Sequence, residues 1–170
     1  EEYFYDSFET ADLYSDIDFG EYDNFMLIHA GSEWQHDVLS DTPSDIPSFF
    51  INLAPGKEYV SQAGDVVYCA ANVPETISQD DNYGVVNSVF AHEFGHSIGF
   101  ADLYNTFNNR PAVGNYVVMD NGGSGIAVTT GLDGETLYEI DATLPSLPGV
   151  WSRLIAWEDV FRHHGIYKDI

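Results

Sequence analysis

The segment 92–96 reads His-Glu-Phe-Gly-His, and these residue types at this spacing could hold a metal ion. On a helix, His92 and His96 project from the same face one turn apart, so their imidazoles can bind the same ion. Glu93 leaves the helix about one residue's rotation away, beside the ion and not on it. This arrangement is typical of zinc peptidases, in which a carboxylate handles the proton of a zinc-bound water.

A catalytic zinc site needs a third protein ligand and an open fourth position. Gly99 follows His96 by three residues and suits the left-handed conformation that ends a helix. Asp102 follows three residues later, so the chain can turn back and present a carboxylate to the same ion. We therefore expect Asp102 to be the third ligand. The competing ligands are Glu135, Glu139, Glu158 and Cys69.

The simplest alternative to a metal site is a pair of histidines that hydrogen-bond within a core, because His-Glu-x-x-His arises by chance in many proteins. The preceding segment 85–91 is mostly apolar, which predicts a buried helix with histidines in an organised interior. This favours the metal site. Cys69 lies in an apolar segment that reads as a buried strand, so a small core residue explains it better than a ligand does.

Composition excludes several classes of partner. The 170 residues suffice for one domain with a hydrophobic core, and 44% apolar residues indicate a globular protein. A net charge of −23 with five Lys and Arg argues against nucleic acid and anionic membranes, which both need basic patches. The acidic surface suits solubility in salt or binding of cations such as calcium, and a solvated surface without a specific role is the default.

The cysteine content and the chain ends bear on processing. One cysteine excludes an internal disulfide, which fits the cytosol and also bacterial secreted proteins that rely on calcium. The sequence has no signal peptide and no apolar run long enough to span a membrane. It begins at Glu1 without an initiator methionine, and we interpret it as a processed product or a fragment of a larger precursor.

The apolar pattern predicts an α+β fold. Strands are expected over 24–30, 49–53 and 65–71, each followed by glycine or proline. A short helix is expected over 6–14. The metal helix is expected to run from N-cap residues at 80–82 to about residue 98.

The second half of the chain has a weaker pattern. After Asp102 no regular periodicity is visible until Pro148, which is expected to open a final helix. Two acidic clusters could bind calcium, a cation that prefers oxygen ligands, or could serve as helix caps and turns. These clusters are Asp16, Asp18 and Asp23, and Asp80, Asp81 and Asn82. His36 lies in a loop and could line the cleft, whereas His29 is expected to be a core histidine.

Residues 92–102 fit the extended pattern His-Glu-x-x-His-x-x-Gly-x-x-Asp, and Met119 lies downstream in an expected turn. In these features the chain resembles the metzincin peptidases, and within that clan it is most similar to the immune inhibitor A-type secreted metallopeptidases. The stretches 22–31, 116–120 and 156–158 support the resemblance, which covers most of the chain from about residue 16.

The resemblance implies a single metallopeptidase catalytic domain over residues 1–170. Its expected features are a twisted mixed β-sheet, a buried active-site helix, a Met-turn and a C-terminal helix. The implied zinc ligands are His92, His96 and Asp102. Glu93 is then the general base and later the general acid, and Met119 forms the apolar floor of the site.

The resemblance also implies an activity and a setting. The chain is expected to be a secreted, extracellular zinc endopeptidase that cleaves proteins or peptides, with calcium as a further cation. Other domains or chains of the same precursor are expected partners, and neither nucleic acid nor membrane insertion is expected.

The chain departs from the family pattern in three places. The family's domain begins with a strand and a long helix before the acidic loop, and we expect only a remnant of that helix here. We also expect the 170 residues to exclude the family's propeptide and its C-terminal β-rich domains. Some metzincins carry a tyrosine two residues after the methionine as a transition-state donor, and here that position is Asn121. Tyr104 and Tyr116 are candidates to replace this tyrosine.

Two other functions stay open. A catalytically silent, peptidase-like module of a secreted or surface assembly would fit the departures, but such a scaffold has no need of Glu93. A zinc amidohydrolase of deformylase type would use Cys69 as a ligand, which the spacing from Gly99 to Asp102 disfavours.

Overall fold

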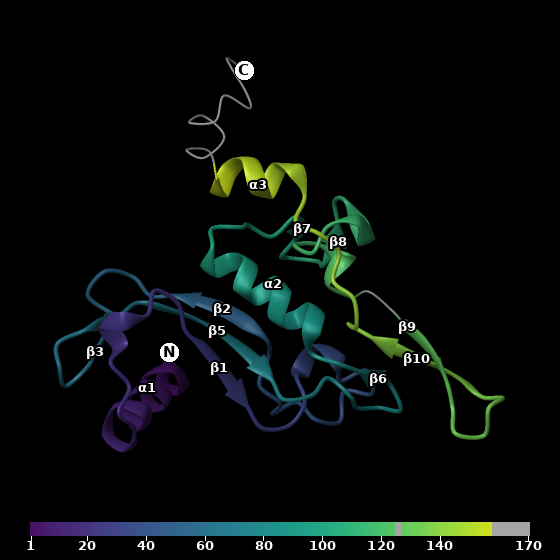
Figure 1. The fold of residues 1–170 in the computed structure, drawn as a ribbon, viewed down its shortest axis with the longest axis horizontal. Helices are drawn as coiled ribbons and strands as arrows, with labels where there is room; N and C mark the ends of the chain where they lie inside the picture. The colour runs from purple at the N-terminus through teal and green to yellow at the C-terminus, as the bar shows by residue number, and fades with distance from the viewer. Residues whose placement is uncertain (125–126, 158–170) are drawn as a thin grey trace, which may run out of the picture.

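The computed structural model describes residues 1–124 and 127–157 and has an α+β fold, as the sequence pattern predicts (Figure 1). Within these residues, three α-helices combine with short strands: α1 (Glu2–Tyr14), α2 (Asn87–Ser97) and α3 (Val150–Ala156). No helix in this described part has the length and apolar character that a membrane crossing requires.

A mixed three-stranded sheet supports helix α2. Its strand order is β1 (Met26–His29), β5 (Cys69–Pro74), β2 (Phe49–Asn52), with β1 parallel and β2 antiparallel to β5. All six residues of β5 are buried, because this central strand lies under α2. Strand β2 is an edge strand of this sheet, and it also packs against α2 (Figure 1). The strands expected over 24–30 and 49–53 are confirmed.

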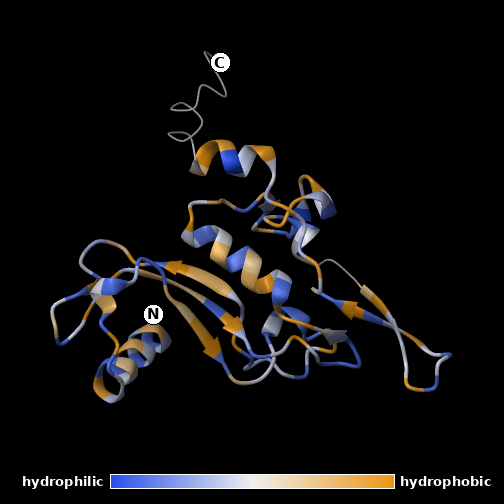
Figure 2. Cartoon of the chain, in the orientation of Figure 1, coloured by the Kyte–Doolittle hydropathy of each residue, from blue (hydrophilic) through white to orange (hydrophobic). Residues whose placement is uncertain are grey.

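Helix α1 packs an aromatic face beneath the sheet. Its buried Phe4 and Phe8 have ring centroids 4.6 Å apart, and Phe8 meets the ring of Phe25 edge-on at 5.3 Å. In Figure 2 the apolar residues concentrate on the strands of the mixed sheet, while α1 and α2 alternate between apolar and polar residues. The helix begins at Glu2, four residues before its expected start.

The single strand expected over 65–71 is wrong. The chain forms β4 (Val66–Val67), which pairs with β3 (Tyr59–Val60), and then β5, which continues to Pro74. Between the two strands, the carbonyl of Tyr68 accepts a hydrogen bond from the amide of Leu53 over 2.8 Å. The backbone therefore changes its pairing partner at a point that no break in hydrophobicity marks.

The expected start of the metal helix at 80–82 is also wrong. Asp80 and Asp81 have φ angles of 55° and 59°, in the left-handed region, whereas an N-cap residue takes an extended backbone. They form a tight turn, and β6 (Tyr83–Gly84) follows before α2 begins at Asn87. The helix ends as expected, since Gly99 has a φ of 91°.

The segment after Asp102 is more regular than its sequence indicates. Two short strands, β7 (Tyr104–Asn105) and β8 (Arg110–Pro111), pair with each other. A hairpin of β9 (Ala127–Thr130) and β10 (Leu137–Asp141) adds to β6 in the order β6-β10-β9. Most of the hairpin's side chains are exposed, so it lacks the apolar alternation that would reveal strands.

The C-terminal part of the described chain confirms a final helix. Helix α3 begins at Val150, two residues after Pro148. Strand β10 is tied to the start of α2, since Val85 and Ser88 donate main-chain hydrogen bonds to the carbonyls of Asp141 and Ala142, each over 3.0 Å. Residues from 158 onward, including Glu158, lie outside the described residues.

Candidate metal centre

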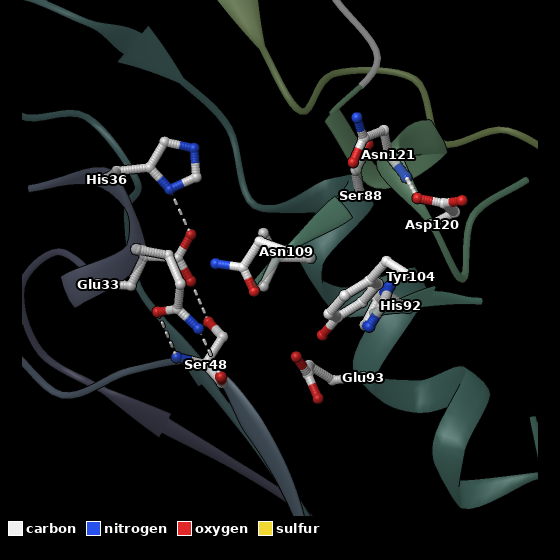
Figure 3. A pocket seen from close by; sticks show the side chains of 12 residues that line it. Glu33, His36, Ser48, Ser88, His92, Glu93, Tyr104, Asn109, Asp120 and Asn121 are labelled. Carbon is white, nitrogen blue, oxygen red and sulfur yellow. Dashed lines mark hydrogen bonds and ion pairs between the residues drawn. The ribbon is translucent and has the colours of Figure 1, made fainter. Parts of the chain in front are cut away.

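Helix α2 carries His92 and Glu93 into the wall of a cavity of about 350 Å³ (Figure 3). The loop that precedes β2 forms the facing wall with Glu33, His36 and Ser48. Gly95 allows α2 to approach the segment that contains Met119. A Cβ at that position would lie 2.6 Å from Sδ of Met119, so only glycine allows this approach.

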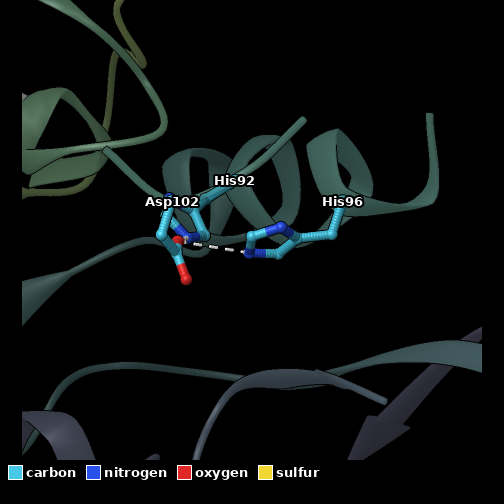
Figure 4. Close-up of side chains that lie close together, drawn as sticks. All are labelled: His92, His96 and Asp102. Carbon is cyan, nitrogen blue, oxygen red and sulfur yellow. Dashed lines mark ion pairs between the residues drawn. The ribbon is translucent and has the colours of Figure 1, made fainter. Parts of the chain in front are cut away.

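The side chains of His92, His96 and Asp102 converge on one point (Figure 4). Oδ1 of Asp102 lies 3.1 Å from Nε2 of His92 and 3.3 Å from Nε2 of His96. The chain returns to the helix through the left-handed Gly99, whose amide donates to the carbonyl of His96 over 3.0 Å. The turn inferred from the spacing thus brings the carboxylate beside both imidazoles.

Main-chain carbonyls orient both imidazoles. Nδ1 of His92 donates to the carbonyl of Val118 over 2.8 Å, and Nδ1 of His96 donates to the carbonyl of Phe100 over 2.9 Å. Because a carbonyl oxygen can only accept, we assign the proton of each neutral ring to Nδ1, which leaves the Nε2 lone pairs facing Asp102. Histidines that ligate metals are held in this way.

Unpaired acceptors at this point fit a cation. The buried Oδ1 of Asp102 and Oε2 of Glu93 have no hydrogen-bond partner among residues 1–124 and 127–157. Two imidazole nitrogens and one carboxylate oxygen match the ligand set of a catalytic zinc site, which keeps one position open. His92, His96 and Asp102 would hold the ion.

The charges of the three residues are coupled. Burial lowers the pKa values of His92 and His96, but the protonated rings would donate to Asp102 as well as to the carbonyls, which outweighs burial, and both pKa values are raised. Burial also raises the pKa of Asp102, but its hydrogen bonds and charge interactions with the two histidines outweigh that effect and lower it. Protons and a divalent cation would therefore compete for this cluster.

Glu93 lies beside the three converging residues. The residue is 7% exposed, and burial raises the pKa of its carboxyl to about 7, against the lowering effect of His92 and His96. A general base works best when its pKa lies near the operating pH. The carboxyl group could therefore exchange a proton near neutral pH beside an ion held by the three residues.

Tyr104 shares the cavity with Glu93, and its hydroxyl points toward the Glu93 carboxylate (Figure 3). Tyr104 also lines a smaller cavity with His92, His96 and Asp102. Burial, with the nearby charge of Asp102, raises its pKa to about 12, so the phenol stays protonated and can donate a hydrogen bond. Tyr116, the other candidate from the sequence, is 87% exposed.

Met119 lies fully buried under α2, in an apolar cluster with Phe100 and Val118. Met119 follows Val118, whose carbonyl orients His92. Met119 itself contributes no ligand. Asp120, which the sequence analysis overlooked, fixes this segment. Its Oδ2 accepts hydrogen bonds from three successive amides, those of residues 112–114, and its Oδ1 accepts one from Asn121.

The competing third ligands within the described residues do not join the histidines. Among the described residues, Asp102 is the only carboxylate or thiol grouped with His92 and His96 at metal-ligand spacing. Cys69 is buried in β5, where burial raises the pKa of its thiol. Glu135 and Glu139 are exposed on the β9–β10 hairpin.

One residue of each acidic cluster accepts a main-chain hydrogen bond. Asp18 accepts a hydrogen bond from the amide of Gly20 and caps the 3₁₀ turn Phe19–Glu21. Asp80 accepts one from the amide of Leu39 over 2.8 Å. Its carboxylate lies close to those of Asp37 and Asp41, a grouping that differs from the expected one.

Two further residues of the facing wall concern the site. His36 lines the cavity, as its loop position suggested. The sequence pattern did not point to Glu33, which is only 2% exposed in the structure. Its Oε1 lies 2.5 Å from Nδ1 of His36. The one signal for this pair was its spacing of three residues. His29 is 7% exposed in β1 and lies outside this cavity's lining, as expected of a core histidine. It is only partly satisfied, because Nδ1 pairs with the carbonyl of Ala30 over 3.0 Å while Nε2 has no partner among the described residues.

Neither a protein-family model nor a curated protein sequence matches this chain. The geometry of His92, His96, Asp102 and Glu93 is therefore what supports a function.

Proposed function

We propose that this chain is a zinc-dependent endopeptidase of metzincin type. The observation that carries the proposal is the convergence of two Nδ1-anchored imidazoles and the Asp102 carboxylate, with a buried Glu93 beside them. When bound, zinc would supply a Lewis acid that polarises a peptide carbonyl and makes water a better nucleophile.

Glu93 moves the proton in this mechanism. Its carboxylate takes a proton from the attacking water and then delivers it to the leaving amine. Its pKa of about 7 allows it to accept and to release the proton near neutral pH. Because its Oε2 has no partner among the described residues, it is free to bind water in the cavity.

Tyr104 is the hydrogen-bond donor for the developing oxyanion. Its phenol stays protonated, and it borders both the cavity of Glu93 and the cavity of the three ligands. A donor placed before the reaction begins stabilises the charge that appears in the transition state. Tyr104 would therefore take the role that Asn121, with an amide in place of a phenol, leaves open.

Strand β2 is the expected track for an extended substrate. It pairs with β5 on one side, and Phe49 and Phe50 line the smaller cavity together with the metal-binding residues. A peptide added to β2 as a further strand would pass in front of Glu93. At Ser48 the amide group of Gln35 already pairs with the main chain, over 2.9 and 2.6 Å, and would end this track.

The setting of the enzyme belongs to the same proposal. We expect secreted or extracellular protein substrates, with other parts of the same precursor as partners. Calcium stays an expected additional cation. A catalytically silent module is the outcome that the following experiment would reveal if the peptidase proposal fails.

Casein hydrolysis tests the proposal, with the zinc-loaded protein compared with its Glu93→Gln variant. The parent should hydrolyse casein, and the variant should bind zinc equally well while losing about 10²- to 10⁴-fold in rate. A fully active variant would refute the role of Glu93. A zinc-loaded parent that cleaves nothing would favour the silent module.

A further inference from the structure

The cavity beside Glu93 extends to a polar wall on the loop before β2 (Figure 3). Glu33 lies in this wall and is almost wholly buried. Its carboxylate accepts a hydrogen bond from the hydroxyl of Ser48 and pairs with Nδ1 of His36 at 2.5 Å. A buried carboxyl group is costly unless its oxygens have partners, so these contacts stabilise Glu33 inside the protein.

Negative groups outnumber positive ones around this cavity. Glu33, Glu93 and Asp120 line it, and Asp141 stands behind His36 at 3.6 Å from Nε2. Among the described residues, no lysine or arginine contributes to its lining. The net charge of −23 on the whole chain adds a negative field. A cationic group entering the cavity would therefore be favoured.

The cavity also has unused hydrogen-bonding capacity. A carboxylate offers about four acceptor positions, and His36 and Ser48 occupy two of those on Glu33. Ser88 lines the same cavity with 0% exposure, and its hydroxyl has no partner among residues 1–124 and 127–157. An apolar side chain would strip water from these groups without replacing its hydrogen bonds, which is unfavourable.

We propose that this cavity binds a cationic side chain, lysine or arginine, of the substrate residue next to the scissile bond, and that Glu33 determines this specificity. The inference rests on the proposed peptidase function, because Glu93 forms the other end of the same cavity. His36 moderates the preference, since its ring already occupies one acceptor position of Glu33 at 2.5 Å. Removing His36 should therefore strengthen the preference that removing Glu33 abolishes.

Matched fluorogenic peptides test the specificity of the zinc-loaded protein. The two peptides of a pair differ only in carrying lysine or norleucine at one position. In the first pair this position precedes the scissile bond, and in the second pair it follows the bond. In one pair, lysine should raise kcat/KM by about 10-fold or more, the range expected for a charge-assisted hydrogen bond. A ratio of one or below in both pairs would overturn the proposal.

Two variants assign the preference to residues. Glu33→Gln keeps the shape of the side chain and should bring the lysine-to-norleucine ratio close to one, with circular dichroism as the control for folding. His36→Gln should increase the ratio. Unchanged ratios in both variants would exclude these residues as determinants, and His36→Gln serves alone if Glu33→Gln does not fold.

A binding experiment separates failure of this inference from failure of the peptidase proposal. If no peptide is cleaved, lysine amide and norleucine amide are titrated into the zinc-loaded protein while the ring resonances of His36 are followed by NMR. Shifts with lysine amide alone support a cation site in a silent module. Equal responses, or none, overturn the cation site.

Discussion

The carbonyl oxygen of Val118 accepts a hydrogen bond from Nδ1 of His92 over 2.8 Å, across 26 residues of sequence. This bond joins the segment that contains Met119 to the metal helix. Phe100 makes the equivalent bond to His96. Both imidazoles are therefore oriented by main chain outside the helix that carries them, and the packing of that main chain should influence metal binding.

Gly95→Ala should destabilise the protein, although alanine is the better helix former by about 1 kcal/mol. The new Cβ would lie 2.6 Å from Sδ of Met119 and 3.2 Å from Cδ2 of Phe100, both in a buried cluster. We expect a loss of about 1–3 kcal/mol in the free energy of unfolding, as is usual for overpacking. Urea unfolding measures it.

A double-mutant cycle is the control for this prediction. A Met119→Ala background removes the closest contact and leaves the 3.2 Å approach to Phe100, so Gly95→Ala should destabilise this background less than it destabilises the parent. An increase in the unfolding free energy of the single Gly95→Ala variant would contradict the tight approach of the helix to Met119.

Removing a residue that only hydrogen-bonds to a metal ligand typically weakens metal binding by roughly 10- to 100-fold. Asp102→Asn changes a ligand itself, so we expect it to weaken zinc binding by more than this. The substitution keeps the size of the side chain and removes the charge that faces the two Nε2 atoms. Competition with a chelator measures the affinity. Glu139→Gln, on the exposed hairpin, is the matched control and should bind zinc normally. Unchanged affinity in Asp102→Asn would point to a different third ligand.

Tyr104→Phe should lower kcat by about 10²- to 10³-fold, the cost of losing an oxyanion donor, with little change in KM or in zinc affinity. Tyr116→Phe removes the same hydroxyl from a residue that is 87% exposed and should leave kcat unchanged. If Tyr104→Phe retains the parent's kcat, the oxyanion donor is another group.

Removing His36 should change how stability depends on pH. The hydrogen bond with Glu33, opposed by burial and aided by the charges of Glu33 and Asp141, raises the folded-state pKa of His36 above 6.5. A raised pKa means that the folded protein binds the proton more tightly, so the stabilisation is complete below pH 6.5 and is lost as pH rises through the folded pKa.

Urea unfolding of the parent and of His36→Gln at about pH 5 and about pH 9 checks this sign. The difference in unfolding free energy between the two proteins should be larger at the acidic pH. An equal or larger difference at the alkaline pH would show that His36 is not stabilised in its charged form.

Most of the candidate metal centre could be predicted from the spacing of a few residues. Helical geometry places His92 and His96 on one face, and a left-handed Gly99 returns Asp102, so this part follows from local rules. The wall that holds Glu33 could not be inferred in this way. Its burial depends on Ser48 and other residues far away in the sequence, and a lone acidic residue reads as exposed.

The fold was predictable where apolar residues cluster and obscure elsewhere. Strands β1 and β2 are compact apolar runs and lie where expected. The hairpin of β9 and β10 carries mostly exposed side chains, so its pairing comes from the backbone and from the contact with β6. The turn at 80–82 was mistaken for a cap because aspartate favours both settings.

A crystal structure of the zinc-soaked protein, with diffraction data on both sides of the zinc absorption edge, would identify the ligands of the ion. We predict one zinc ion bound by Nε2 of His92, Nε2 of His96 and a carboxylate oxygen of Asp102, with no fourth protein ligand. Zinc bound elsewhere would contradict this ligand set. A fourth protein ligand would contradict a catalytic role, because a site closed by four protein ligands could only be structural.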